Sequence, residues 1–274
     1  MAASDENSGV KRRAVAAAGV VALSVAVAVP ASAYTTHRVH SVVLPTSTGK
    51  LEASPVATCP GAEHVQFGGF VGTGSASLSG MRRSADNRWT ADGIVPPSGY
   101  GAQFRGKMTA IAYCGSGPVP LKVTHSMRMG ESGAVTATCP AGTVVVAGGF
   151  ATSPQSFVVI KDLERFGTDR WRVFAERYFG RSRTILTSIA YCGAGPAPYL
   201  AISFVSLSAA HVTTVTDCPA GRSLLFGGVR ITTRTPKPAL AGVTAMKAPT
   251  PTSWRVAAGS TTGAGRLAAL AYCR

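Results

Sequence analysis

Hydrophobic and polar residues alternate along much of this chain, and similar alternating stretches return three times. In the clearest stretch, Ile189 and Tyr191 fall on one side of a strand and Ala190 and Cys192 on the other. The valine-rich run at 143–147 is bounded by turn residues, which is typical of a buried strand. After residue 33, no stretch shows sustained helical periodicity with capping residues. The pattern predicts an all-β protein.

The alternating stretches belong to an internal repeat with fixed landmarks. Each copy opens at a Cys-Pro turn, continues through a Gly-Gly pair and a tryptophan, and closes in a strand that ends Ala-Tyr-Cys. The repeat predicts three homologous units with a period of about 80 residues. These units are residues 34–114, 115–192 and 193–274.

The joins between the units are short and nearly identical. Residues 115–120 read Gly-Ser-Gly-Pro-Val-Pro, and residues 193–198 read Gly-Ala-Gly-Pro-Ala-Pro. Because glycine allows a sharp turn and proline stiffens the exit, we expect fixed crossings rather than flexible linkers. The joins favour one pseudo-threefold, β-prism-like domain. Three tandem disulfide-stapled β-sandwich domains are the alternative.

All six cysteines lie at the landmarks of the repeat. An even number at regular positions in an exported chain predicts a disulfide framework. Because each unit owns one opening and one closing cysteine, the repeat selects the pairs Cys59–Cys114, Cys139–Cys192 and Cys218–Cys273. A metal site is the poorer interpretation, since no two cysteines have the C-x-x-C spacing and no histidine neighbours any of them.

The N-terminus has the features of an export signal. Lys11, Arg12 and Arg13 precede an apolar run at 14–29, and Ala31-Ser32-Ala33 fits a signal-peptidase site. We expect residues 1–33 to be a signal peptide that is cleaved between Ala33 and Tyr34, which leaves a secreted protein without a stable membrane span. An uncleaved membrane anchor is the alternative, and the choice between Sec and twin-arginine export stays open.

The chain is strongly basic. Its 27 Lys and Arg against 12 Asp and Glu give a formal net charge of +15. Such a charge attracts anionic polymers, and for an exported protein these are cell-wall or other extracellular polysaccharides rather than a specific nucleic acid. The alternative is the composition of a high-GC genome, which favours Ala, Gly, Val and Arg without any functional meaning.

Catalytic motifs are absent from the sequence. It contains no G-x-S-x-G, H-E-x-x-H or phosphate-binding loop. Asp162 and Glu164 are close in sequence, but the flanking Lys161 and Arg165 favour a solvated charged loop. The isolated histidines are typical of solvent-facing or hydrogen-bonded residues. We therefore expect no enzyme activity, no metal and no cofactor.

The three tryptophans and their neighbouring arginines are the candidate binding residues. An aromatic face suits a sugar ring, and an arginine beside it can hold a carboxylate or phosphate by paired hydrogen bonds. The alternative is that the tryptophans fill the core and that the arginines point into water. The candidates are Trp89, Trp171, Trp254, Arg88, Arg170, Arg172 and Arg255.

The Cys-Pro-Ala-Gly opening at 139–142, Gly149-Phe150 and the strand that ends at Cys192 carry a family resemblance, together with their counterparts. The chain resembles uncharacterised secreted proteins of high-GC Gram-positive bacteria and, more distantly, the vitelline membrane outer layer family. That family forms a β-prism of three sheets, and the resemblance implies such a fold here. The units of this chain are longer and lack the family's acidic turn, so no functional residue is carried over.

These observations lead to three hypotheses about function. The first is a secreted, non-catalytic protein that binds carbohydrate or a cell-envelope polymer through repeated sites. The second is a structural or protein-interaction role, as in a coat component or an inhibitor, without a small ligand. The third is an enzyme of an unrecognised kind. Exposure of the tryptophans and arginines would favour the first hypothesis, and burial would favour the second.

Overall fold

The computed structural model describes residues 34, 36–45, 51–95, 105–154, 156–179, 184–207, 210–233, 242–259 and 265–274. All of them belong to the compact unit Ala31–Arg274. Every helix or strand within these ranges is a β-strand, which confirms the all-β prediction. The predicted signal peptide at 1–33 lies outside the described residues.

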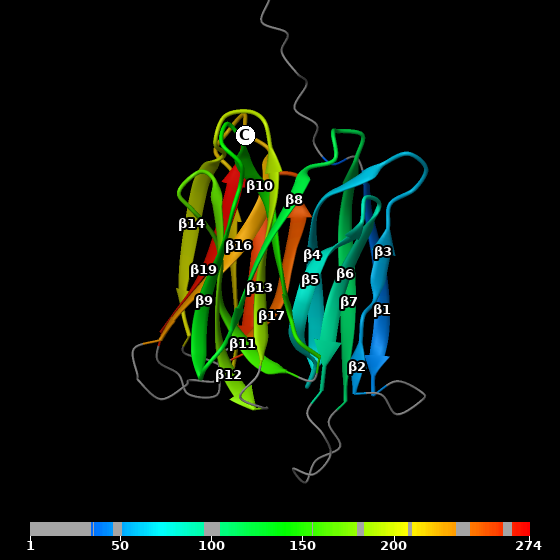
Figure 1. Ribbon diagram of the computed structural model, residues 1–274, viewed down its shortest axis with the longest axis vertical. Coiled ribbons are helices and arrows are strands. Elements are labelled where there is room, and N and C mark those ends of the chain that lie inside the picture. The colour runs from blue at the N-terminus through cyan, green and yellow to red at the C-terminus, as the bar shows by residue number, and fades with distance from the viewer. Residues whose placement is uncertain are drawn as a thin grey trace, which may run out of the picture. The chain divides into compact units, whose positions relative to one another are not determined.

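The strands form three antiparallel sheets, named A, B and C here (Figure 1). Sheet A has the order β1 (Thr36–Leu44), β7 (Gly106–Gly115), β4 (His64–Gly74), β17 (Gly242–Thr250), β18 (Ser253–Gly259) and β15 (His211–Asp217). Sheet B has the order β2 (Glu52–Ala53), β6 (Arg88–Ile94), β5 (Ser77–Ala85), β10 (Val144–Thr152), β13 (Ile185–Gly193) and β8 (Leu121–Arg128), and β3 (Val56–Thr58) also pairs with β6. Sheet C has the order β14 (Tyr199–Ser206), β19 (Gly265–Cys273), β16 (Leu224–Thr233), β11 (Phe157–Phe166), β12 (Arg170–Phe179) and β9 (Ser132–Thr138).

Each sheet is assembled from strands of two sequence units. In sheet A, β4 of the first unit pairs with β17 of the third, and in sheet B, β10 of the second unit pairs with β5 of the first. In sheet C, β16 of the third unit pairs with β11 of the second. The alternative of three tandem sandwiches is therefore wrong, because no unit keeps its strands to itself. The inclination of the sheets that would define a prism stays a prediction.

The three disulfides are the pairs that the repeat predicts, Cys59–Cys114, Cys139–Cys192 and Cys218–Cys273. Each joins the Cys-Pro turn of a unit to its closing strand. The turn is closed in all three units by a backbone hydrogen bond to the proline carbonyl, for example from the amide of Thr143 to the oxygen of Pro140, at 3.1 Å. Gly142 in this turn has a φ of 80°, a conformation that favours glycine.

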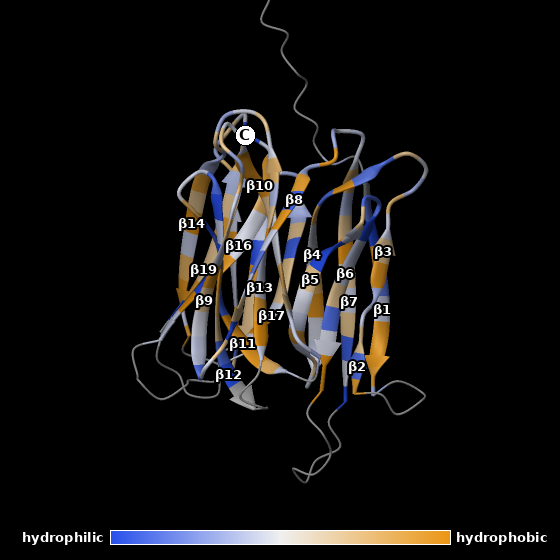
Figure 2. Ribbon diagram, in the orientation of Figure 1, coloured by the Kyte–Doolittle hydropathy of each residue, from blue (hydrophilic) through white to orange (hydrophobic). Residues whose placement is uncertain are grey.

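In each unit, the buried tryptophan packs against the first glycine of the unit's Gly-Gly pair. A side chain at Gly148 would overlap the ring of Trp171, and the same relation holds between Gly68 and Trp89 and between Gly227 and Trp254. Since the glycine and the tryptophan lie in different sheets, this contact holds two sheets together in each unit. Figure 2 shows the matching alternation of hydrophobic and polar residues along single strands.

The second glycine of each pair serves the boundary between units. A Cβ at Gly149 would strike the backbone oxygen of Met81, because β10 of the second unit passes close to β5 of the first there. Gly228 approaches Leu163, and Gly69 approaches Met246, in the same way. The Gly-Gly pair therefore combines two close approaches, one to a tryptophan and one to the neighbouring unit.

Candidate functional site: a polar groove on sheet B

The candidate tryptophans are buried in the core. Trp89 is 1% exposed, and Trp171 and Trp254 are 0% exposed. The indole nitrogen of Trp171 donates to the carbonyl oxygen of Gly149 at 3.1 Å, and that of Trp254 donates to Gly228 at 3.0 Å. The interpretation of these residues as sugar-stacking platforms is wrong, because their rings are enclosed in the core and a sugar cannot reach them. Their burial favours the structural role that was the alternative for the tryptophans.

The candidate arginines do not form one site. Arg88 lies in sheet B, Arg170 and Arg172 lie in sheet C, and Arg255 lies in sheet A. Arg170 is exposed and lies over the ring of Phe166, with 4.7 Å between the guanidinium carbon and the ring centroid. Arg172 is occupied by ion pairs to Asp162 and Glu164. Arg170 also has an ion pair, to Asp169 at 3.8 Å, but it is exposed, so Arg88, Arg170 and Arg255 stay candidates for contact with a ligand.

Asp162 and Glu164 lie on β11 and not in a solvated loop. The Glu164 side chain is 2% exposed and forms ion pairs with Arg172 and Arg230 from the two flanking strands. Burial, followed by the charge of Glu164, raises the pKa of Asp162 to about 6. The loop interpretation was wrong because a bulge between Ile160 and Asp162 interrupts the alternation that marks a strand.

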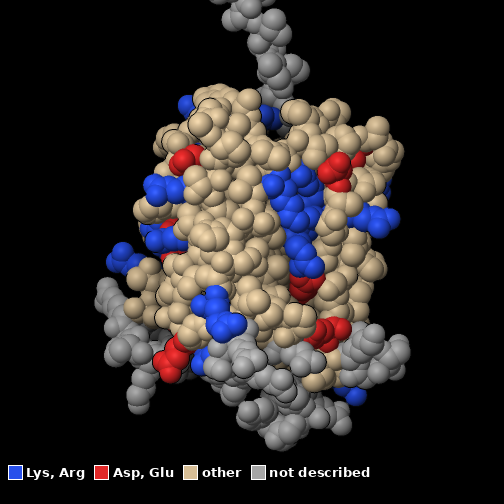
Figure 3. Space-filling model, in the orientation of Figure 1, with Lys and Arg blue, Asp and Glu red and all other residues tan. Residues whose placement is uncertain are grey.

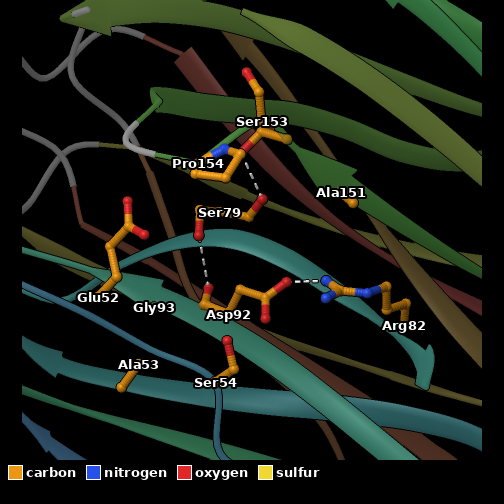
Figure 4. A pocket seen from close by; sticks show the side chains of 11 residues that line it. Glu52, Ala53, Ser54, Ser79, Arg82, Asp92, Gly93, Ala151, Ser153 and Pro154 are labelled. Atoms are coloured by element: carbon orange, nitrogen blue, oxygen red, sulfur yellow. Dashed lines mark hydrogen bonds and ion pairs between the residues drawn. The ribbon is translucent and has the colours of Figure 1, made fainter.

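The structure contains a groove that the sequence does not reveal, on sheet B where the first unit meets the second. Its volume is about 320 Å³. The small residues Ala53, Gly93 and Ala151 lie among the larger polar side chains of the lining and leave the space of the groove open (Figure 4). Its lining residues are Glu52, Ala53, Ser54, Ser79, Arg82, Asp92, Gly93, Ala151, Thr152, Ser153 and Pro154.

The polar side chains of the groove are held by hydrogen bonds within the sheet. Arg82 on β5 forms an ion pair with Asp92 on β6, and Figure 4 shows its guanidinium pointing at that carboxylate. The Ser79 hydroxyl donates to the carbonyl oxygen of Asp92 at 3.2 Å, and the Thr152 hydroxyl donates to the carbonyl oxygen of Ser79 at 2.8 Å. Three strands of two units therefore fix the polar surface.

Basic side chains extend the polar surface from the groove toward β8. Burial is the main cause that lowers the pKa of Lys122 on β8, and the nearby charges of Arg82 and Arg83 lower it further. Burial also lowers the pKa of Arg82. Figure 3 shows a band of Lys and Arg on the face in view, over the region where Figure 1 draws β8 and β5. Arg82 is already paired with Asp92, so the exposed Lys122 is the cation of this set that a ligand can reach.

The groove is suited to binding a polar ligand by hydrogen bonds. Hydroxyl, carboxylate and guanidinium groups line it, and no histidine or aromatic ring is among its lining residues. Asp92 is ion-paired with Arg82. Within the described residues, no group of three or more His, Cys, Asp or Glu side chains is placed to hold a metal ion.

Comparison with known proteins gives no family for this chain. No protein-family model matches it, and no curated protein sequence is significantly similar to it. Across the part of the chain that the structure describes, there is no helix of the length and apolar character that crossing a membrane requires.

Proposed function

We propose that this chain is an exported, non-catalytic protein that binds a hydroxyl-rich anionic polymer, a cell-wall or other extracellular polysaccharide, in the groove on sheet B. The observation that carries the proposal is the position of the groove, whose hydroxyl and carboxylate lining continues into the basic neighbours Arg82 and Lys122. Sugar hydroxyls hydrogen-bond to such carboxylates and hydroxyls, and acidic groups pair with the cations.

Export is supported by the disulfides and by the charge. Three disulfides are typical of proteins that fold in an oxidising compartment. A net charge of +15 concentrates a protein near anionic cell-envelope polymers. The groove adds short-range hydrogen bonds to the long-range attraction by net charge. Because salt screens the attraction between charges, the proposal requires binding that persists at high salt.

The test is a pull-down of the residue 34–274 protein with peptidoglycan, chitin, cellulose and an anionic polysaccharide, at low and high salt. Ala151→Phe fills the groove without a change in charge, and Thr124→Phe places the same ring on the exposed edge strand β8 as its control. Lys122→Glu reverses the neighbouring charge, and Lys107→Glu makes the same reversal at an exposed site on β7.

We expect Ala151→Phe to abolish binding at high salt and Lys122→Glu to weaken it mainly at low salt, with both controls unaffected. Equal binding by wild type and Ala151→Phe would overturn the proposal for the groove. If wild type and all variants lose binding at high salt, the binding is explained by net charge alone. Failure to bind any polymer would favour the protein-interaction hypothesis, for which the exposed Ile202 and Phe204 on the edge strand β14 are the first residues to examine.

A further inference from the structure

The three unit boundaries carry one equivalent cross-strand pair each, on the outward side of the sheet. The first partner directly follows Met81, Leu163 or Met246, the residues that meet the second glycine of the neighbouring unit. The second partner directly follows the buried tryptophan. The register pairs are Arg82 with Thr90, Glu164 with Arg172, and Lys247 with Arg255.

In sheet C, the acidic and basic side chains at this position neutralise each other. Glu164 is almost fully buried and accepts hydrogen bonds from its cross-strand partner Arg172 and from Arg230 on β16. In sheet B, the single cation Arg82 is balanced by Asp92 on the adjacent strand. In sheets B and C, the cation at this position therefore pairs with a carboxylate of the protein.

In sheet A the equivalent position contains two cations that face each other. Lys247 on β17 is in direct register with Arg255 on β18, and both side chains are partly exposed. Like charges directly opposite each other destabilise a sheet. Within the described ranges, no Asp or Glu forms an ion pair with either residue: Asp217, on the next strand β15, lies opposite Ser253 and is paired with neither.

The neighbouring strand β4 adds no charged side chain to this position in sheet A. The Nε of Arg255 is buried and has no hydrogen-bond partner among the described residues, and the same holds for the Nε of its counterpart Arg172 in sheet C, so this atom does not distinguish the two positions. The position that Arg230 occupies beside Glu164 in sheet C is taken by Val71 in sheet A, so this face offers two cations and an apolar neighbour.

We propose that Lys247 and Arg255 bind an oxyanion, a phosphate or carboxylate group, in the place where sheet C carries the Glu164 carboxylate. The site is separate from the groove on sheet B and does not depend on the function proposed for it. An oxyanion relieves the repulsion between the two cations and forms charge-assisted hydrogen bonds to both. On an anionic polymer, such a site would bind the acidic groups and leave the sugar hydroxyls to sheet B.

The test measures the unfolding midpoint and the Nε–H resonance of Arg255 as inorganic phosphate is added, at constant ionic strength set with sodium chloride. Wild type should show a saturable rise in the midpoint and a shift of that resonance. Lys247→Glu rebuilds the Glu–Arg pair of sheet C, so it should be more stable than wild type without phosphate and bind phosphate at least roughly tenfold more weakly. Lys107→Glu, with the same change in net charge, should respond as wild type does.

Lys247→Gln provides a second variant if the charge reversal fails to fold, and it should also lose the phosphate response. Glycerol phosphate and glucuronate distinguish the source of the oxyanion, since one offers a phosphate and the other a carboxylate. A Lys247→Glu or Lys247→Gln protein that binds phosphate as tightly as wild type would overturn the proposal. The proposal would also be overturned if the unfolding midpoint of wild type depended on ionic strength but not on phosphate. Neither result bears on polymer binding by the groove.

Discussion

The backbone N–H of Arg83 donates a 2.6 Å hydrogen bond to the phenolic oxygen of Tyr191, although the two residues belong to different sequence units. The guanidinium of Arg83 also lies over the tyrosine ring, 4.9 Å from its centroid, and donates to the carbonyl oxygen of Pro120 at 2.6 Å. Arg165 makes the same three contacts with Tyr272 and Pro198. The tyrosine beside each closing cysteine therefore joins one unit to the next.

Tyr191→Phe tests this junction. The substitution removes the acceptor for a buried N–H, so we expect it to lower the free energy of unfolding by about 1–3 kcal/mol. Urea unfolding with intact disulfides measures the change. Tyr199→Phe is the control, because Tyr199 is 49% exposed and should tolerate the loss of its hydroxyl. Equal stability of the two variants would contradict a structural role for the hydroxyl of Tyr191.

Gly148→Ala tests the contact between the first glycine and the tryptophan. The new Cβ would overlap the ring of Trp171, which is enclosed in the core, so we expect a loss of about 1–3 kcal/mol or more. Gly130→Ala is the matched control, since its Cβ would meet no atom within 4 Å. Thermal unfolding of both variants gives the comparison. A stable Gly148→Ala protein would show that the indole can move aside.

The burial of all three tryptophans predicts their fluorescence. Their exposed fractions of 0–1% leave no ring surface for iodide to reach. We expect iodide to quench the native protein far less than the urea-unfolded chain. Native emission that iodide quenches as strongly as the unfolded chain would contradict the buried positions and reopen the sugar-stacking interpretation.

The sequence was sufficient for the strands and the disulfides because both depend on local pattern and on a regular period. Alternation along 188–192 is a property of a single strand, and the cysteine pairs follow from one opening and one closing cysteine in each unit. The sequence could not predict that β10 pairs with β5. A Gly-Gly pair in a strand indicates that another segment lies close to it but does not indicate which segment.

The candidate site was missed for a related reason. The groove on sheet B gathers Glu52, Arg82, Asp92 and Ser153 from two units, and of these only Arg82 and Asp92 belong to one pair of consecutive strands. Nothing in their local neighbourhoods distinguishes them from solvated polar residues. The three tryptophans gave a stronger sequence signal, but their recurrence in each unit reflects a shared packing contact with glycine rather than a shared ligand.

Asp162 predicts a specific dependence of stability on pH. Burial raises its pKa from 3.8 to about 6, so the folded protein holds this proton more tightly than the unfolded chain does. Its contribution to stability is therefore complete below about pH 4 and is lost as the pH rises through about 6. Relative to Asp162→Asn, wild type should lose at most about 3 kcal/mol between about pH 4 and pH 7. Urea unfolding across this range measures the difference, and a difference that does not change with pH would contradict the assignment.

Tyr34 completes the third boundary, where the arginine of the other two is replaced by Ala248. The amide of Ala248 still donates to the hydroxyl of Tyr113, at 2.6 Å, but alanine has no guanidinium to cover the tyrosine ring. Tyr34 packs edge-on against Tyr113 instead, with 4.8 Å between ring centroids, and against Phe67 at 5.5 Å. The first residue after the expected cleavage site thus takes the place of Arg83 and Arg165.

Tyr34→Ala should therefore lower the free energy of unfolding of the 34–274 protein by about 1–3 kcal/mol, because it removes two aromatic contacts and the area that they bury. Tyr34→Phe keeps both ring contacts and should stay close to wild type. Urea unfolding of the two variants decides between a packing role and an unimportant terminal residue. If Tyr34→Ala unfolds at the same urea concentration as Tyr34→Phe, the third boundary is held by the Ala248–Tyr113 hydrogen bond without help from the N-terminal ring.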